Sequence, residues 1–125
     1  MTDLTNVTNN IWPAGMAMDK AGYIWVAESY NGTTSQMGIE STSGINITSG
    51  ALSPQGIAVG DNGNVWVADY TGCIVEIDPS TGGILHTYTV NGSPIGIAID
   101  HSGNVWVTNY LQYTVTEVVG VAIGP

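Results

Sequence analysis

Arginine is absent from this sequence of 125 residues, and lysine occurs once, as Lys20. Ten acidic residues therefore leave a formal net charge of −9. Nucleic-acid binding relies on Lys and Arg side chains that displace counterions from phosphates, so the composition argues against a nucleic-acid partner. Anionic membrane surfaces are disfavoured for the same reason. The charge favours solubility and attraction of cations instead.

Cysteine is almost absent as well. Because Cys73 is the single cysteine, no intrachain disulfide can form. No CxxC or Cys/His pattern lies beside it, so neither a disulfide scaffold nor a zinc site is predicted. We interpret Cys73 as a small buried hydrophobic residue.

Targeting and membrane-spanning segments are also missing from the sequence. The opening MTDLTNVTNN has neither the basic region nor the apolar core of a signal peptide, and no apolar run approaches membrane length. No membrane partner is therefore expected. Abundant Asn, Thr, Ser and Gly with so little Lys and Arg is nevertheless typical of secreted or periplasmic bacterial proteins.

What the sequence does contain is a repeat. Its most similar segments are IWVAESY at 24–30, VWVADYT at 65–71 and VWVTNYL at 105–111. Each copy follows a Pro-x-Gly at a fixed distance, and the prolines Pro13, Pro54 and Pro94 are separated by 41 and 40 residues. A period of this length is typical of propeller blades and solenoid units.

Each repeat predicts several short strands. A run in which large apolar residues alternate with Ala follows the Pro-x-Gly, and a turn rich in Asp, Asn and Gly comes next. The second run is apolar at every position, so both of its faces are expected to be buried. The middle repeat adds a third run at 73–78 and a polar-alternating fourth run at 85–90. The residues that recur and that we assign to blade packing are Gly15, Gly56, Gly96, Trp25, Trp66 and Trp106.

Four short strands per unit, without helical periodicity, predict an all-β chain built as a β-propeller of three four-stranded blades. The expected blades are residues 13–50, 54–90 and 94–125, the last of them incomplete. Residues 3–9 occupy the position of a fourth strand before Pro13. Three blades do not close a ring, so we predict a head-to-tail homodimer with six blades, in which residues 3–9 complete the partner's last blade. The alternative is that this sequence is part of a longer propeller.

Two motifs identify a resemblance. The segments PQGIAVGDNGNVWVAD at 54–69 and IVEIDPSTG at 74–82 resemble the NHL and streptogramin-lyase-like propeller repeats, and the likeness extends over about residues 13–119. The resemblance implies a second possible function, a relic of a metal-dependent lyase or lactonase. Lactonases of this kind carry a metal-ligating Asn between Pro and Gly, whereas this sequence has Ala14, Gln55 and Ile95 there. Streptogramin lyases use a His, but His86 and His101 have no equivalent His in other repeats and are expected to face solvent.

Candidate ligand-binding residues follow the second apolar run of each repeat. Because such positions recur at one rim of a closed ring, Glu28, Asp69 and Asn109 would form a circle of oxygen-bearing groups. Calcium and magnesium prefer oxygen ligands of this kind. The alternative is that these side chains hydrogen-bond to the backbone of the adjacent turn. Tyr70, Tyr110 and Trp12 are expected near the same rim, where they could bind a carbohydrate or a peptide.

No catalytic residue is predicted, because no Ser/His/Asp order and no pair of catalytic carboxylates is present. The sequence favours a non-enzymatic module that self-assembles and presents a rim or central channel to a small ligand or cation. No cofactor is expected apart from calcium or magnesium at the rim. A third possibility is a structural segment of a larger secreted protein.

Overall fold

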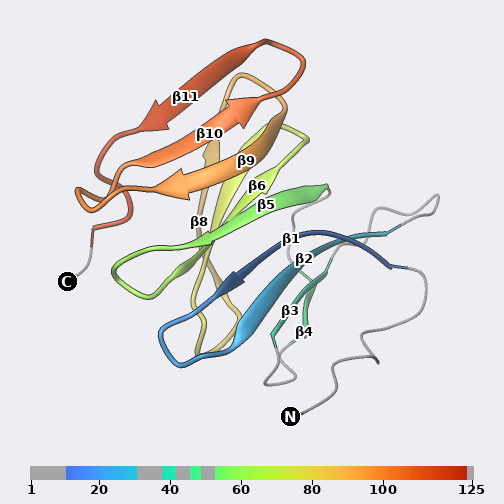
Figure 1. Ribbon diagram of the computed structural model, residues 1–125, viewed down its shortest axis with the longest axis vertical. Helices are drawn as coiled ribbons and strands as arrows, with labels where there is room; N and C mark the ends of the chain where they lie inside the picture. Colours follow the sequence, from blue (N-terminus) through green and yellow to red (C-terminus); the bar gives the residue numbers. More distant parts are fainter. Residues whose placement is uncertain (1–10, 31–37, 42–45, 49–52, 124–125) are drawn as a thin grey trace.

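The computed structural model describes residues 11–30, 38–41, 46–48 and 53–123. This part of the chain forms three antiparallel sheets and contains no helix (Figure 1). The prediction of an all-β chain is therefore confirmed.

Each sheet is built from one repeat, and we call the sheets blades 1, 2 and 3. Blade 1 contains β1 (Ile11–Met18), β2 (Ile24–Tyr30), β3 (Gly38–Ser41) and β4 (Asn46–Thr48). Blade 2 contains β5 (Pro54–Val59), β6 (Val65–Asp69), β7 (Cys73–Ile77) and β8 (Ile84–Thr89). Blade 3 contains β9 (Pro94–Ile99), β10 (Val105–Asn109) and β11 (Thr114–Val118). Within each blade the strands pair in sequence order.

The blades are stacked through their first strands. β1 contacts β5, and β5 contacts β9, so that the three follow one another along the middle of the molecule (Figure 1). Each blade extends outward from its first strand to its last. The fourth strand of blade 2, β8, is largely exposed, as expected for an outer edge.

The hairpin between the first and second strands of each blade follows the predicted turn chemistry. Gly22, Gly63 and Gly103 have φ angles of 90°, 87° and 79°, a left-handed conformation that glycine adopts without steric cost. In blades 1 and 3 the Oδ1 atoms of Asp19 and Asp100 accept hydrogen bonds from backbone N–H groups of the same turn. These contacts fix where the second strand begins.

A β-bulge lies at the Pro-x-Gly of every blade. The pairing register shifts between Pro13 and Gly15 in blade 1 and between Pro54 and Gly56 in blade 2. In blade 3 the same shift occurs opposite the segment between Val107 and Asn109. A bulge adds one residue to one strand and leaves it unpaired with the neighbouring strand. The residue between Pro and Gly, which is Ala14, Gln55 or Ile95, is therefore unpaired with the second strand in all three blades.

The hydrophobic core consists of two joints between blades. Trp25 and Ala27 of blade 1 pack on the valine-rich face of blade 2. Trp66, Ala68 and Ile74 of blade 2 pack in the same way on blade 3. Every residue of β6 is buried, so the middle blade shows the burial on both faces that the sequence predicts.

Blade 3 differs from that expectation. Side chains of β10 alternate between buried and exposed, because no further blade of the described residues covers one of its faces. Trp106, on that face, is 38% exposed. Beyond β11 the chain turns back, where the backbone N–H of Ala122 donates to the carbonyl oxygen of Gly103 at 2.9 Å. In the described residues blade 3 has three strands. Residues 3–9, predicted to complete the last blade of a partner chain, lie outside the described part.

Candidate functional site

The predicted circle of oxygen ligands lies at the ends of the second strands. Asp69 ends β6 and is buried. Its Oδ1 accepts hydrogen bonds from the backbone N–H of Ser53 at 3.1 Å and from the backbone N–H and hydroxyl of Thr71 at 2.9 and 2.7 Å. The Asp69 carboxylate thereby connects the turn before β5 with the turn after β6. These contacts support an anchoring role for Asp69.

Asn109 occupies the equivalent position in blade 3 and is also buried. Its Nδ2 donates to the hydroxyls of Thr114 at 3.1 Å and Thr116 at 2.8 Å on β11. Its Oδ1 is buried without a hydrogen-bond partner. Glu28 lies opposite Pro13 in the backbone pairing of β1 with β2, and its side chain is outside the described part. A cation held by this circle stays a prediction.

The aromatic residues predicted for the same rim are in different environments. Tyr70 is half-buried and Tyr110 is 64% exposed. The backbone of Trp12 pairs with Ser29, while its side chain is outside the described part. The sequence analysis missed Tyr113, which is 96% exposed. Tyr113 directly precedes β11 with a φ of 54°, a conformation that costs a non-glycine residue about 1 kcal/mol or more.

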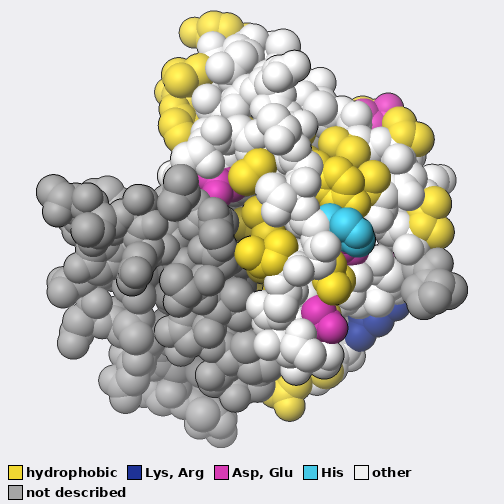
Figure 2. All heavy atoms as spheres, turned by 180° about the vertical axis from the view of Figure 1, so that it is seen from behind, with side chains coloured by type: hydrophobic (Ala, Val, Ile, Leu, Met, Phe, Trp, Pro, Cys, Tyr) yellow, Lys and Arg dark blue, Asp and Glu magenta, His cyan; other side chains and the backbone are white. Residues whose placement is uncertain are grey.

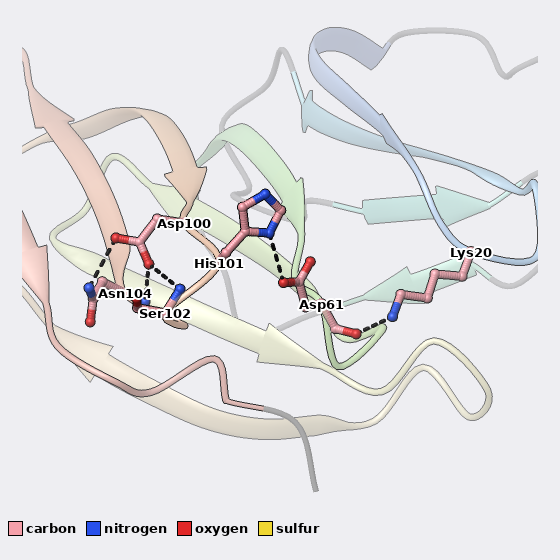
Figure 3. Close-up of polar contacts among 6 residues, drawn as sticks. All are labelled: Lys20, Asp61, Asp100, His101, Ser102 and Asn104. Carbon is pink, nitrogen blue, oxygen red and sulfur yellow. Dashed lines mark hydrogen bonds and ion pairs between the residues drawn. The ribbon is translucent and has the colours of Figure 1, made fainter.

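A second group of polar residues lies on the hairpins at the opposite ends of these strands (Figure 3). Lys20, Asp61 and His101 occupy equivalent positions in the three blades. The Lys20 ammonium donates to the backbone carbonyl of Asp61, and Asp61 Oδ2 lies 3.1 Å from His101 Nδ1. Both contacts cross from one blade to the next. Because these side chains are exposed, the contacts contribute little to stability. We interpret them as contacts that orient neighbouring blades and not as a catalytic or binding site.

The same hairpins hold the tryptophan indoles in blades 1 and 3. Asp19 Oδ2 accepts from Trp25 Nε1 at 2.8 Å, and Asp100 Oδ2 accepts from Trp106 Nε1 at 3.0 Å. In blade 2 the equivalent residue is Gly60, which has no side chain to accept this bond. Trp66 Nε1 is consequently buried without a partner. A buried donor in this state costs about 1–3 kcal/mol.

Among these carboxylates, Asp100 has the most strongly shifted pKa. The hydrogen bond from the Trp106 indole, followed by the backbone hydrogen bond from Asn104, lowers its pKa from 3.8 to about 2. Both donors favour the ionised carboxylate. Asn104 also donates its side-chain Nδ2 to Asp100 Oδ2 at 3.0 Å (Figure 3).

We expect Asp100→Asn to lose this stabilisation in a pH-dependent way. Because the pKa of Asp100 is lower in the folded state, the carboxylate stabilises the fold fully above about pH 4 and loses its effect as the pH falls through about 2. The free energy of unfolding of the variant, measured by urea denaturation, should therefore be below that of the original protein at neutral pH and converge with it towards pH 2. Asp61→Asn, on the equivalent hairpin of blade 2, is the control, because no tryptophan indole donates to a carboxylate there. A difference that stays constant down to pH 2 would contradict this assignment.

A further polar cluster lies on blade 2. Glu76 is buried, with Oε1 accepting from Asn64 Nδ2 at 2.9 Å and Oε2 lying 2.7 Å from His86 Nδ1. Burial, and then the charge of Glu76, raise the pKa of Tyr88. The Tyr88 ring stacks on Trp66 at a centroid distance of 5.8 Å. His86 is exposed, as expected, but its contact with a buried Glu was not predicted.

Among the described residues, no group of three or more His, Cys, Asp or Glu side chains could hold a metal ion. The same part of the chain has no helix long and apolar enough to cross a membrane.

Comparisons with known proteins agree with the arrangement of the blades. Residues 52–73 match the family described as NHL repeat. The matched segment contains β5, β6 and the hairpin between them. This part of blade 2 is therefore similar to an NHL repeat. Both the predicted resemblance and the predicted propeller fold are thereby confirmed.

Solved structures show the same fold for this propeller. A virginiamycin B lyase from Staphylococcus aureus is 19% identical, with a TM-score of 0.64, over 97% of this chain and 46% of the lyase. A streptogramin B lyase is 18% identical, with a TM-score of 0.65, over 90% of this chain and 42% of that protein. A Bacteroides caccae protein of unknown function is 17% identical, with a TM-score of 0.60, over 90% and 48% of the two chains. The propeller chain thus spans less than half the length of these structures. A search of curated protein sequences gives no match.

Proposed function

We propose that this chain is a non-enzymatic half propeller that closes a six-bladed ring with a second copy, arranged head to tail. The observation that carries the proposal is the solvent exposure of apolar side chains on the two outermost faces of the blade stack. Both faces expose side chains whose equivalents in blade 2 are buried or half-buried. The chain therefore presents both halves of a joint that it forms twice internally.

One of these faces lies on blade 3 and is called here the Trp106 face. It consists of Trp106, Thr108, Val115 and Glu117, which are cross-strand neighbours on one side of the sheet. Its counterpart on blade 2 buries Trp66, Ala68 and Ile74 against blade 3. By contrast, Trp106 is 38% and Val115 63% exposed. Figure 2 shows hydrophobic side chains on the surface of blade 3, at the top of the view.

The other face lies on blade 1 and is called the Met16 face. Met16 pairs with Val26, and Met18 pairs with Ile24, so all four side chains lie on the same side of the sheet. Met16 is 68% and Met18 62% exposed. The equivalent Ile57 of blade 2 is buried against Trp25 and Ala27.

The two faces are complementary because the internal joints pair a tryptophan face with a valine- and isoleucine-rich face. Docking the Trp106 face of one copy on the Met16 face of another would repeat that pairing. A two-fold arrangement then forms two such joints and uses six blades, within the range of closed propellers. Exposed apolar faces of this kind favour association.

The closed ring would present a rim and a central channel to a ligand. Support for a ligand at the rim comes from the exposed aromatic side chains of Tyr110 and Tyr113. They lie in the loop between β10 and β11, where Tyr113 holds a strained backbone conformation. Such strain is often retained at functional loops.

Light scattering coupled to size exclusion tests the assembly. We expect twice the 13.0 kDa mass of one chain. Trp106→Glu and Met16→Glu should each give the mass of a single chain, because a head-to-tail joint needs both faces. A dimer joined through only one kind of face, Trp106 face to Trp106 face or Met16 face to Met16 face, would respond to only one of the two substitutions.

Leu85→Glu is the matched control. Leu85 is 43% exposed, close to the value for Trp106, but lies on the outer strand β8 of blade 2. This variant should keep the mass of the dimer. A single-chain mass for the original protein, or a dimer that survives both Trp106→Glu and Met16→Glu, would overturn the proposal.

A further inference from the structure

The geometry points to a specific register for the joint between two copies: the backbone carbonyl of the partner's Ala14 docks on Gly96. This inference rests on the proposed head-to-tail ring and adds the contact that aligns one chain on the other. It follows from the glycine of the Pro-x-Gly motif in the three blades.

In the two internal joints this glycine makes room for the next blade. A Cβ built on Gly15 would lie 2.5 Å from the carbonyl oxygen of Gln55, and one built on Gly56 would lie 2.2 Å from the carbonyl oxygen of Ile95. Gln55 and Ile95 are the residues between Pro and Gly in the following blade. Side-chain carbons do not approach a carbonyl oxygen so closely, so only glycine fits at positions 15 and 56.

The bulge explains why this carbonyl reaches the preceding blade. The residue between Pro and Gly is the extra residue of the first strand, and a bulge re-aims the backbone at the place where it occurs. Because the contact uses a carbonyl, the side chain at this position is not specified. Ala14, Gln55 and Ile95 accordingly differ in size and polarity.

Gly96 has the same motif but no such neighbour among the described residues of its own chain. The three atoms nearest to a Cβ built on Gly96 all belong to Thr108, at 2.9, 3.9 and 4.0 Å. At the other end of the stack, Ala14 is exposed and lies at the bulge of blade 1. When the Trp106 face docks on the Met16 face as the internal joints do, the carbonyl of Ala14 falls on Gly96.

Thr108 gives the experiment its control. The equivalents of Thr108 in the other blades are Ala27 and Ala68, both buried in joints. Thr108→Ala therefore restores the residue of the internal joints and also removes the two atoms nearest to a Cβ at position 96, Oγ1 at 2.9 Å and Cγ2 at 3.9 Å. In this background Gly96→Ala meets no obstacle within its own subunit, and any loss of association reports the partner.

The test measures the dimer dissociation constant by sedimentation equilibrium for Thr108→Ala and for Thr108→Ala with Gly96→Ala. The first variant should remain a dimer. The second should dissociate about 100-fold or more readily, because overpacking acts at both joints of the ring, while its thermal unfolding as a single chain stays unchanged. Ala14→Gln in the original sequence should leave the dissociation constant unchanged, because the contact uses the carbonyl.

The outcomes separate this inference from the proposed ring. A dimer that tolerates Gly96→Ala in the Thr108→Ala background overturns the register while leaving the ring in place. A dimer lost with Thr108→Ala alone also overturns the register, because the joint would then differ from the internal ones. A single-chain mass for the original protein refutes the ring itself.

Discussion

Gly56→Ala should lower the free energy of unfolding by about 3 kcal/mol and the melting temperature by roughly 10 °C. The added Cβ would lie 2.2 Å from the carbonyl oxygen of Ile95, and neither atom is at the flexible end of a side chain. To accommodate the methyl group, β5 and β9 would have to move apart. That movement would loosen the joint in which Trp66 and Ala68 pack on Val105 and Val107.

Two other glycines provide the comparison for Gly56. Gly15→Ala places its Cβ 2.5 Å from the carbonyl oxygen of Gln55 and should be nearly as destabilising. Gly83→Ala meets only the hydroxyl of Thr81, at 3.3 Å, and should change the free energy of unfolding by less than about 0.5 kcal/mol. Urea denaturation followed by circular dichroism measures all three variants. Equal costs for Gly56→Ala and Gly83→Ala would refute the close approach of neighbouring blades.

The repeat itself was enough to predict the sheets. Because period, turn residues and apolar runs are all local, the sequence showed where strands begin and that the second strand of blade 2 is buried on both faces. It could not show that the residue between Pro and Gly is a bulge. A bulge depends on how two strands pair, and nothing in a variable position such as Ala14, Gln55 or Ile95 indicates that its carbonyl makes the contact.

The candidate site was harder to predict, because burial depends on what lies next to each blade. Trp25, Trp66 and Trp106 have equivalent sequence surroundings, but Trp106 lies on a face that no further blade covers. Likewise, the sequence places Asp69 and Asn109 at strand ends, where we predicted a rim of ligand-binding groups. The structure shows both side chains buried and hydrogen-bonded. Nothing in the sequence indicated the backbone conformation of Tyr113. Tyr113 directly precedes the third strand of blade 3, and the equivalent position in blade 2 is Gly72, which also has a positive φ.

The same dependence on neighbours explains Gly60. The sequence shows that the turn acid of blade 2 comes one residue later than in the other blades, as Asp61. Only the structure shows the consequence, which is that Trp66 Nε1 has lost the carboxylate that Trp25 and Trp106 retain. Indoles that align on the sequence therefore contribute to stability through different interactions.

Trp66→Ala should be the most destabilising substitution in the chain, with a cost of about 3–5 kcal/mol. Trp66 is fully buried in the joint between blades 2 and 3 and stacks on Tyr88. Since small domains are stable by only about 5–15 kcal/mol in total, this variant should be close to unfolding at room temperature. Circular dichroism in urea is the appropriate measurement, because tryptophan fluorescence changes with the substitution itself.

Phenylalanine at positions 66 and 25 separates the packing of the indole from its hydrogen bond. Trp66→Phe keeps a ring on Tyr88 and removes a buried N–H that has no acceptor, so the loss of packing is partly offset. Trp25→Phe removes the 2.8 Å hydrogen bond to Asp19 and leaves that carboxylate without its indole donor. Trp66→Phe should therefore cost about 1 kcal/mol less than Trp25→Phe. The reverse order would mean that the Trp66 indole N–H stabilises blade 2 through an acceptor, in conflict with the glycine at position 60.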